Sequence, residues 1–341
     1  MSTLDRLRGS APAKRHNART IAALTGNPGC ARRSVLDAAG VDKVRLAERI
    51  GFPGNFGQSR FALARGNAFE AMLKADDCAL LRSVLDVGVV GCHDLGADDD
   101  NTLQARHDRT RELLATERSA LIDHPLLTLS VAGQTVFLEP DLIAFPSEGR
   151  LRVVEIKSFA IVDGQADAAA VSAAAVQAAV YVLALRELLG EDRVSHEVVL
   201  VCPVDFSLRP VAAVLDVRKQ LATLRRQLSR LSSVSELVAS LPSTVSFDVA
   251  LPVESLTASL SAVSARYVPE CLSLCEMSVF CRDEASGSTA ALGRSVREAL
   301  GGVEEISEVL ALAGGAAAGP GQAEAAALLR QAARLRDEAL S

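Results

Sequence analysis

The sequence predicts an α/β protein, and three stretches of the chain carry that prediction. Residues 137–159 have the composition of two strands rich in Val, Ile, Leu and Phe, joined by a turn at Pro146-Ser147-Glu148-Gly149. Residues 168–189 have the apolar periodicity of a helix, and their many alanines suit close packing against a sheet. Residues 194–202 are almost entirely apolar after His196, as expected for a central strand.

The two strands of residues 137–159 also carry charges that a buried strand would not normally hold. Asp141 belongs to the first strand, and Glu155 and Lys157 belong to the second. Because side chains alternate between the faces of a strand, Glu155 and Lys157 share one face, while Val154 and Ile156 take the other. Charged groups among apolar neighbours are costly unless they are paired or bind a metal. The pattern therefore predicts a functional site.

The composition is that of a soluble globular protein, and a cytoplasmic location is expected. Of the 341 residues, 49% are hydrophobic and 23% are charged. No apolar run reaches the roughly 18 residues of a membrane span, and the N-terminus lacks the apolar core of a secretory signal. The net charge of −6 excludes a wholly basic nucleic-acid binder but allows a local basic groove.

Seven cysteines, an odd number in a chain without a secretory signal, argue against a secreted disulfide scaffold. They favour a cytosolic set that contains a metal or cluster site together with some buried thiols. Cys271, Cys275 and Cys281 form a tight group near the end of the chain, and Cys30 lies near its start. Cys202, inside an apolar strand, is interpreted as a core thiol.

The first part of the chain is expected to begin with a flexible basic arm over residues 1–20, with a mitochondrial transit peptide as the alternative. Cys30 then opens a helix that Gly40 closes. A second helix begins near Arg65 and includes Glu70, whose simplest interpretation is a solvent-facing side chain. The run Asp98-Asp99-Asp100 is expected to be an exposed loop.

The remaining elements are expected as follows. Residues 102–123 form a helix with interspersed charges, residues 126–131 a strand, and residues 209–233 a helix rich in arginine. That basic helix is either a solvated face or a surface that follows a phosphate backbone. A linker rich in Ala and Gly follows residue 286, and the chain ends in an amphipathic helix over residues 323–340.

Three motifs occur together in the middle of the chain. They are Glu139-Pro140-Asp141 on the first strand, Glu155-Ile156-Lys157 on the second, and Gln177 with Tyr181 four residues apart on the following helix. This combination resembles the PD-(D/E)xK nuclease superfamily, in particular its RecB-like branch, over about residues 60–205. The resemblance implies a restriction-endonuclease-like fold, with a mixed central sheet flanked by helices, and a metal-dependent DNA nuclease.

The resemblance also implies roles for individual residues. Asp141, Glu155 and the backbone carbonyl of Ile156 offer hard oxygen ligands to Mg²⁺ or Mn²⁺. Lys157 would orient the attacking water or contact the phosphate. Glu70, in the sequence GNAFE, matches in position the residue from the first core helix that completes such sites.

Other residues match the branch less fully. RecB-like nucleases commonly have a histidine near the position of Glu70, and this sequence has none there, since His107 lies too far along the chain. Gln177 and Tyr181 would flank the active site and position DNA. The alternative for that pair is helix–sheet packing.

The pattern Cys271-x3-Cys275-x5-Cys281, preceded by Cys30, resembles the iron–sulfur version of these nucleases, found in CRISPR-associated adaptation exonucleases and in the AddB subunit of a helicase–nuclease. It implies a [4Fe–4S] cluster, or else a structural Zn²⁺, in a cap that joins the two ends of the chain. The first interval is three residues where two is usual. Cys78 and Cys92 are rival candidates for the upstream ligand, and three helix cysteines that are merely buried are the structural alternative.

The expected organisation is a nuclease domain with its cysteine cluster over residues 21–285 and a linker with a C-terminal helix over residues 286–341. The expected activity is that of an exonuclease on single strands or DNA ends, in DNA repair, CRISPR adaptation or phage (antiviral) defence. A catalytically inactive DNA-binding or scaffold subunit is the alternative. No P-loop motif is present, so a helicase or other defence or repair protein is the expected partner. With no Trp and two Tyr, binding directed at the DNA backbone is favoured over base readout.

Overall fold

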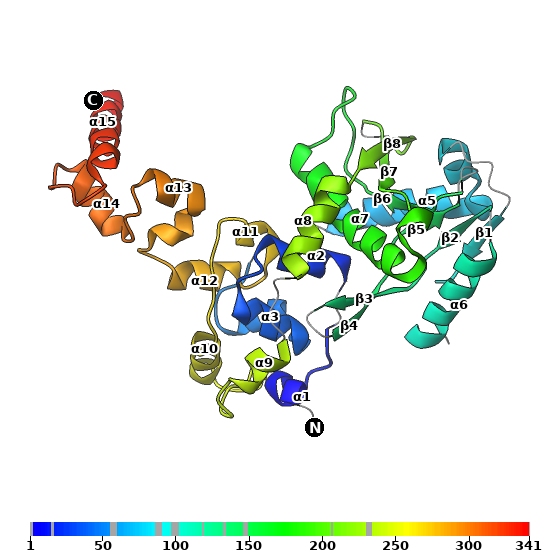
Figure 1. The fold of residues 1–341 in the computed structure, drawn as a ribbon, viewed down its shortest axis with the longest axis horizontal. Coiled ribbons are helices and arrows are strands. Elements are labelled where there is room, and N and C mark those ends of the chain that lie inside the picture. Colours follow the sequence, from blue (N-terminus) through cyan, green and yellow to red (C-terminus); the bar gives the residue numbers. More distant parts are fainter. Residues whose placement is uncertain are drawn as a thin grey trace. The chain divides into compact units, whose positions relative to one another are not determined.

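The structure is a computed structural model, and it describes residues 3–14, 17–54, 60–85, 91–96, 102–117, 119–131, 134–145, 149–205, 207–229 and 234–340. The chain forms two compact units (Figure 1). The first unit contains Met1–Ala11, Gly29–Phe56 and Leu241–Ser341, and the second contains Pro12–Pro28 and Gly57–Ser240.

The second unit is built on a six-stranded sheet with strand order β1-β2-β5-β6-β7-β8. The pairs β1/β2 and β6/β7 are parallel, whereas β2/β5, β5/β6 and β7/β8 are antiparallel, so the sheet is mixed. The strands are β1 (Gly91–Asp94), β2 (Ala120–Asp123), β5 (Leu142–Ala144), β6 (Arg152–Ile156), β7 (Glu197–Pro203) and β8 (Pro210–Asp216). A mixed α/β architecture, as the sequence predicts, is thereby confirmed.

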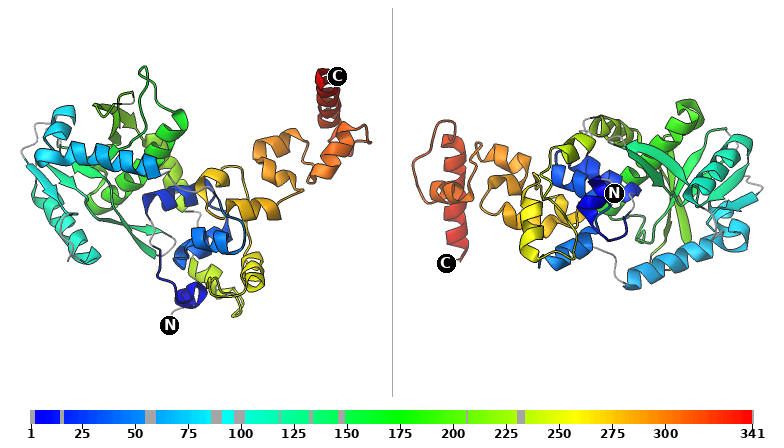
Figure 2. Two further views of the ribbon diagram at one scale, coloured as in Figure 1. Left: turned by 180° about the vertical axis from the view of Figure 1, so that it is seen from behind. Right: turned by 90° about the horizontal axis from the view of Figure 1, so that it is seen from below.

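Helices cover both faces of this sheet (Figure 2). Helix α7 (Ala168–Leu189) packs on one face against residues such as Ile143 and Val153. Helix α5 (Arg60–Leu85) packs on the other against residues such as Leu142 and Val154. The alternation along β5 and β6 follows from the two-residue period of a strand.

Several further elements belong to the described part of the second unit. A separate hairpin joins β3 (Leu127–Val131) to β4 (Gln134–Leu138), and α6 (Leu103–Thr116) precedes β2. Helices α2 (Ala18–Gly26) and α8 (Arg218–Leu228) share the hydrophobic core beneath α7, with Ile21, Leu221 and Leu224 among its buried residues. The remaining short elements are η1 (Glu191–Arg193) and α9 (Val234–Ala239).

The strand directions bring several strand ends to one edge of the sheet. Strands β1, β2, β6 and β7 run the same way, and β5 runs against them. The carboxyl ends of β1, β2 and β6 therefore lie at the same edge as the start of β5. In the register Asp123 is opposite Leu142, which is opposite Val154. This edge carries the charged residues of the candidate site.

The first unit is helical in its described part. Its helices are α1 (Thr3–Arg8), α3 (Ala31–Ala38), α4 (Lys43–Arg49), α10 (Val253–Ser261), α11 (Cys271–Leu274), α12 (Ser278–Glu284), η2 (Thr289–Leu292), α13 (Arg294–Ala299), α14 (Ile306–Ala313) and α15 (Ala323–Leu340). Cys30 precedes α3, as the sequence predicts, and Gly40, at φ +66°, follows it. Val303, Leu312 and Ala326 pack together around α14 and α15.

The start of the chain differs from the flexible arm that its basic residues suggest. Leu7 in α1 is fully buried, and Arg6 donates hydrogen bonds to the carbonyl oxygens of Ser243 and Val245. Arg8 donates to the carbonyl oxygen of Ala39. These arginines therefore anchor α1 within the first unit.

Two predicted helices are wrong in part, because each contains a strand. Residues 120–123 form β2, all four of them buried, after α6 has ended at Thr116. Residues 210–216 form the edge strand β8, which pairs with β7 along its whole length, and the helix begins only at Arg218. The predicted turn residues 146–148, the acidic run 98–100, and Arg15 and Arg230 lie outside the described residues.

Helix α7 is long and apolar enough to cross a membrane by length and composition. Of its most apolar window, 56% is buried inside the protein, as in the core helix of a soluble protein. Within the described ranges no other helix meets the same criteria.

Candidate functional site

The three charged residues that the sequence singles out lie together at the edge of the sheet. Asp141 directly precedes β5, Glu155 is in β6, and Lys157 directly follows β6. The Lys157 ammonium lies 2.6 Å from Glu155 Oε2 and 3.5 Å from Asp141 Oδ2. Asp141 Oδ2 also accepts a hydrogen bond of 2.7 Å from the backbone N–H of Ile156. By the two-residue period of a strand, Glu155 in β6 lies on the same face as Val153, which packs in the core with α7.

Glu155 is the most deeply buried member of this group. It is 1% exposed, whereas the side chains of Asp141 and Lys157 are 25% and 22% exposed. Burial raises the pKa of Glu155 to about 8, Lys157 opposes the rise, and Asp141 adds to it. Glu155 Oε1 has no hydrogen-bond partner in the described part of the chain. Burial alone would lower the pKa of Lys157, but Glu155 and Asp141 raise it overall.

Gln177 and Tyr181 lie on the helix that faces this group. Gln177 Nε2 donates a hydrogen bond of 3.2 Å to the Tyr181 hydroxyl oxygen. Tyr181 is 4% exposed; burial raises its pKa well above the ordinary value, and the charge of Glu155 raises it further. The structure thus brings the predicted pair close to Glu155, while Tyr181 also packs in the core as the alternative interpretation expects.

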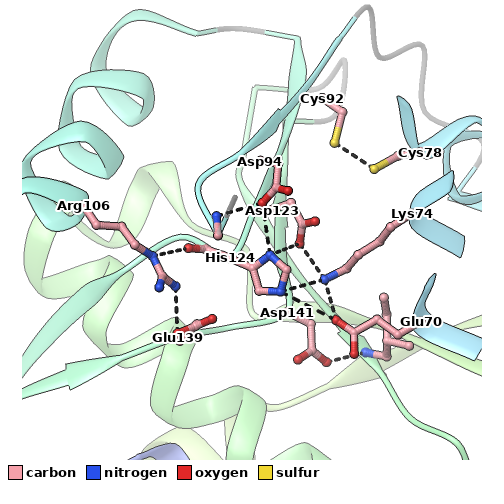
Figure 3. A network of polar contacts seen from close by, with 12 residues as sticks. Glu70, Lys74, Cys78, Cys92, Asp94, Arg106, Asp123, His124, Glu139 and Asp141 are labelled. Carbon is pink, nitrogen blue, oxygen red and sulfur yellow. Dashed lines mark hydrogen bonds and ion pairs between the residues drawn. The ribbon is translucent and has the colours of Figure 1, made fainter. Parts of the chain in front are cut away.

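Glu70 belongs to a different set of contacts, on the α5 side of the sheet (Figure 3). Its carboxylate lies 2.5 Å from Lys74 Nζ, one helical turn further along α5, and 3.8 Å from His124 Nε2. Lys74 Nζ also lies 2.7 Å from Asp123 Oδ1. The two groups meet through the backbone, because the N–H of His124 donates to the carbonyl oxygen of Asp141 at 3.3 Å.

His124 connects the ends of β1 and β2. Its Nδ1 lies 3.2 Å from Asp94 Oδ1 and 3.2 Å from Asp123 Oδ1, and its Nε2 lies 3.2 Å from Lys74 Nζ. The hydrogen bond with Asp123 raises the pKa of His124 overall. The backbone of His124 has φ +48°, which breaks the strand alternation directly after β2.

Asp94, Asp123 and His124 form a group that could hold a metal ion. One ligand atom from each lies within 4.8 Å of the other two (Figure 3). Sequence reasoning missed this group, because its members come from strands 30 residues apart and β2 itself was not predicted. The nearest sequence signal is the apolar run that ends in Asp123-His124.

The other motif residue, Glu139, lies at the periphery of the site. Arg106 of α6 lies 2.7 Å from Glu139 Oε2, and its Nε donates to the carbonyl oxygen of His124 at 3.0 Å. Arg106 therefore joins the segment before Asp141 to the end of β2. His107, the next residue, is buried, and its Nδ1 lies 2.8 Å from the carbonyl oxygen of Leu126.

The four cysteines of the predicted cluster all belong to the first unit. Cys30, Cys271, Cys275 and Cys281 are free thiols between 7% and 9% exposed. Cys281 interacts electrostatically with Cys275 and Cys30, and burial raises its pKa to about 12. Arg32, two residues after Cys30, donates a hydrogen bond of 3.3 Å to Cys281 Sγ. Segments 241 or more residues apart in the sequence are thus neighbours here.

Buried cations surround these thiols. Arg32, Arg33 and Lys43 are each no more than 6% exposed. Their partners include Glu284 for Arg32, at 2.5 Å, and Asp37 for Arg33, at 3.1 Å. Arg33 and Lys43 also interact electrostatically with Cys275. Burial raises the pKa of the Cys275 and Cys281 thiols, and these positive charges oppose that rise.

The rival candidates for the upstream ligand lie in the second unit. Cys78 Sγ and Cys92 Sγ are 2.8 Å apart, so these two thiols are partners of each other. Cys202 is a fully buried residue of β7, and burial raises its pKa to about 12.

Comparison with known proteins gives little to set beside this geometry. No protein-family model matches the chain, and no curated protein matches it. A solved structure described as the crystal structure of SSO0001 aligns with 67% of this chain and 82% of its own, at 10% identity and a TM-score of 0.24. A likeness at that TM-score carries no argument about fold or function.

Proposed function

We propose that the second unit is a metal-dependent phosphodiesterase that cleaves DNA, built on a restriction-endonuclease-like core. The observation that carries the proposal is the position of Glu155. Its carboxylate is 1% exposed, has an oxygen without a hydrogen-bond partner, and lies beside Asp141 and Lys157. A buried carboxylate of this kind is costly unless a cation joins it, and a site with a raised pKa in such surroundings is a candidate for catalysis.

The donor set fits a hard divalent cation. Carboxylate and backbone carbonyl oxygens are the ligands that Mg²⁺ and Mn²⁺ prefer, so Asp141, Glu155 and the carbonyl of Ile156 would hold the ion. The bound ion would lower the pKa of a coordinated water and neutralise charge on the phosphate oxygens. The N–H of Ile156 fixes Asp141 Oδ2, which leaves Oδ1 as the freer ligand atom.

Lys157 has the position to handle the substrate. Its side chain is partly exposed, and its ammonium is held within 3.5 Å of both carboxylates. A phosphate that approaches Asp141 from solvent therefore meets the ammonium at the same place, and Lys157 would orient both the phosphate and the attacking water. Gln177 and Tyr181, from the facing helix, would position the adjacent DNA.

Helix α5 places a further cation near the end of β6. Gly66 lies close to Ser158, since an added Cβ would be 3.5 Å from Ser158 Oγ, so this helix runs beside the residue that follows Lys157. The neighbouring Arg65 has a buried guanidinium nitrogen, Nη2, with no hydrogen-bond partner among the described residues. A phosphate of the DNA backbone is a group that would satisfy it.

The four cysteines of the first unit are proposed to hold a [4Fe–4S] cluster that forms a cap from the two ends of the chain. Four buried free thiols with cations beside them fit the donor requirement of such a cluster, and also that of a structural Zn²⁺. Iron and sulfide analysis of anaerobically purified protein, which is brown if a cluster is present, separates the two.

The proposed setting follows the sequence motifs: an exonuclease on single strands or DNA ends, cytoplasmic, in DNA repair, CRISPR adaptation or phage defence. A helicase or another repair or defence protein would supply unwinding. These assignments rest on the resemblance to RecB-like nucleases rather than on the geometry of the site.

The test is cleavage of end-labelled single- and double-stranded DNA with Mg²⁺ or Mn²⁺, using anaerobically purified full-length protein. Asp141→Asn, Glu155→Gln and Lys157→Met are each expected to lower the cleavage rate about 100-fold or more, because each removes a ligand or a charge that acts on the reacting phosphate. The matched control is Asp192→Asn, an exposed carboxylate of η1, which should cleave at the normal rate.

Two outcomes would count against the proposal. Cleavage at the normal rate by all three variants would remove the site assignment. DNA retention without cleavage by the unmodified protein, with either metal, would favour the scaffold subunit instead.

A further inference from the structure

The thiols of Cys78 and Cys92, which the proposed function does not use, are in contact with each other on the α5 side of the sheet. Cys78 Sγ and Cys92 Sγ are 2.8 Å apart (Figure 3). This distance is shorter than an ordinary non-bonded contact between two sulfur atoms, and it exceeds the length of a disulfide bond, about 2.05 Å, by less than one ångström. Cys78 is 2% exposed and Cys92 is half-buried, so one member of the pair is accessible from solvent.

The backbone around Cys78 is arranged to make this contact. Helix α5 is interrupted after Lys74, and Asp76, Asp77 and Cys78 have φ values of +50°, +55° and +58°. Three successive non-glycine residues in the left-handed region are strained, and such strain persists where the surrounding structure imposes it. The interruption brings Cys78 to the start of β1, where Cys92 lies.

The contact also lies beside charged side chains. Lys74, four residues before Cys78 on α5, and Asp77, directly before it, both interact electrostatically with the Cys78 thiol. A disulfide forms when the sulfur of one cysteine attacks another sulfur, and the 2.8 Å contact already places these two sulfur atoms together.

We propose that Cys78 and Cys92 are a reversible disulfide site, oxidised by peroxide and reduced by dithiols. In the oxidation, each sulfur loses its proton and one electron as the S–S bond forms. The O–O bond of hydrogen peroxide breaks and takes up the two electrons and two protons, giving two molecules of water. In the reverse reaction a dithiol attacks the disulfide and is itself oxidised.

The bond would tie α5 to β1 on the α5 side of the sheet. Lys74 lies on α5 directly before the interruption, and Asp94 is the last residue of β1. Both contact His124, so the disulfide would join the two elements whose side chains converge on that imidazole. Because the sulfurs are already in contact, the oxidised and reduced states differ little in backbone position.

The test is thiol mapping of the full-length protein after treatment with hydrogen peroxide, with all remaining thiols alkylated during denaturation. The expected result is a cross-linked pair of peptides containing Cys78 and Cys92, lighter by two hydrogen atoms and absent after reduction with a dithiol. Cys92→Ser and Cys78→Ser should each lose it. Cys202→Ser, which removes a buried thiol of β7, should keep it.

A second readout does not depend on peptide mapping or on nuclease activity. The peroxide-treated protein should unfold at a higher urea concentration than the dithiol-treated protein, and this difference should vanish in Cys92→Ser. Separate alkylation of Cys78 and Cys92 after peroxide treatment, or a urea difference of the same size in Cys92→Ser, would overturn the proposal.

Discussion

Glu155 is buried at a position where an ionised carboxylate is destabilised, and its neighbours offset only part of the free energy that desolvation costs. Removing an ionised carboxylate from water costs on the order of several kcal/mol of free energy, which is comparable to the attraction that a well-placed cation provides. Lys157, at 2.6 Å from Oε2, provides one such partner, while Oε1 has none among the described residues. Burial disfavours the charge of Glu155 more than Lys157 favours it, and Asp141 adds to the effect of burial, so the pKa of Glu155 is raised to about 8.

Removing the Lys157 ammonium should show how much it stabilises the ionised Glu155 carboxylate. In Lys157→Met the carboxylate loses its partner, and we expect the metal-free protein to be destabilised by about 3 kcal/mol at alkaline pH, the usual cost of breaking a buried pair. The loss should be smaller at acidic pH, where Glu155 can accept a proton. The measurement is urea unfolding with a chelator present at both pH values.

The direction of the pH effect follows from the raised pKa of Glu155. Glu155 ionises at lower pH in the unfolded chain than in the folded one. Its contribution to the free energy of unfolding is therefore fully present below the ordinary pKa of a glutamate, and it declines as the pH rises to about 8. In Lys157→Met this decline should extend to higher pH. In Glu155→Gln it should be absent, and a decline of the same size there would show that another group is responsible.

At the scale of the elements, helix α7 holds the site through close packing on the sheet. Ala178 and Ala179 are 1% and 0% exposed, which leaves no space for a larger side chain between the helix and the core. Ala174 and Ala175, one turn earlier, are also buried. The small residues allow Gln177 and Tyr181 to approach the end of β6.

Filling that contact should destabilise the second unit. Ala179→Leu is expected to lower the free energy of unfolding by about 1–3 kcal/mol, because the added side chain overpacks a dense core. Ala173→Leu places the same side chain at an exposed position of the same helix and should change the value by less than about 0.5 kcal/mol. Equal effects of the two substitutions in urea unfolding would mean that α7 is not packed as described.

The elements that sequence predicts are those with a regular period. The shared face of Glu155 and Lys157 follows from the two-residue period of a strand, and α7 follows from its apolar stripe and length. Strand β2 is only four residues long and follows a charged helix, so its apolar run was too short to separate from that helix. Strand β8 was missed because its pairing with β7, rather than its own pattern, determines its conformation.

The contacts around His124 and the contact between Cys78 and Cys92 were not predicted from the sequence. His124 joins Asp94, Lys74 and Asp123 only because three elements meet at one edge of the sheet. The residues with positive φ at His124 and in α5 are not glycines, so the sequence contains no glycine that would predict these turns. The interruption of α5 was not predicted for the same reason, since its left-handed residues are not glycines. The contact between Cys78 and Cys92, which depends on that interruption, was therefore missed as well.

At the scale of the whole molecule, the charged residues of the candidate site and the four cysteines belong to different compact units. Asp141, Glu155 and Lys157 belong to the second unit, while the four cysteines belong to the first. The first unit is composed of three stretches of sequence, and contacts such as Arg32 with Cys281 join them. A ligand bound by these cysteines would tie the stretches together.

Within the second unit, two groups of side chains compete as positions for a divalent cation. The Asp94–Asp123–His124 group contains an imidazole, and a lysine lies beside a buried carboxylate in both groups, Lys74 at 2.7 Å from Asp123 and Lys157 at 2.6 Å from Glu155. Asp141 and Glu155 offer oxygen atoms alone, and one of these has no partner in the described chain. Because Mn²⁺ prefers oxygen ligands, we expect it at the second position.

The most direct measurement is the anomalous X-ray signal of manganese in crystals of the full-length protein soaked with Mn²⁺. The account predicts a peak between the carboxylates of Asp141 and Glu155 that disappears in Glu155→Gln. A peak confined to Asp94, Asp123 and His124, or none near Glu155 at saturating Mn²⁺, would contradict it.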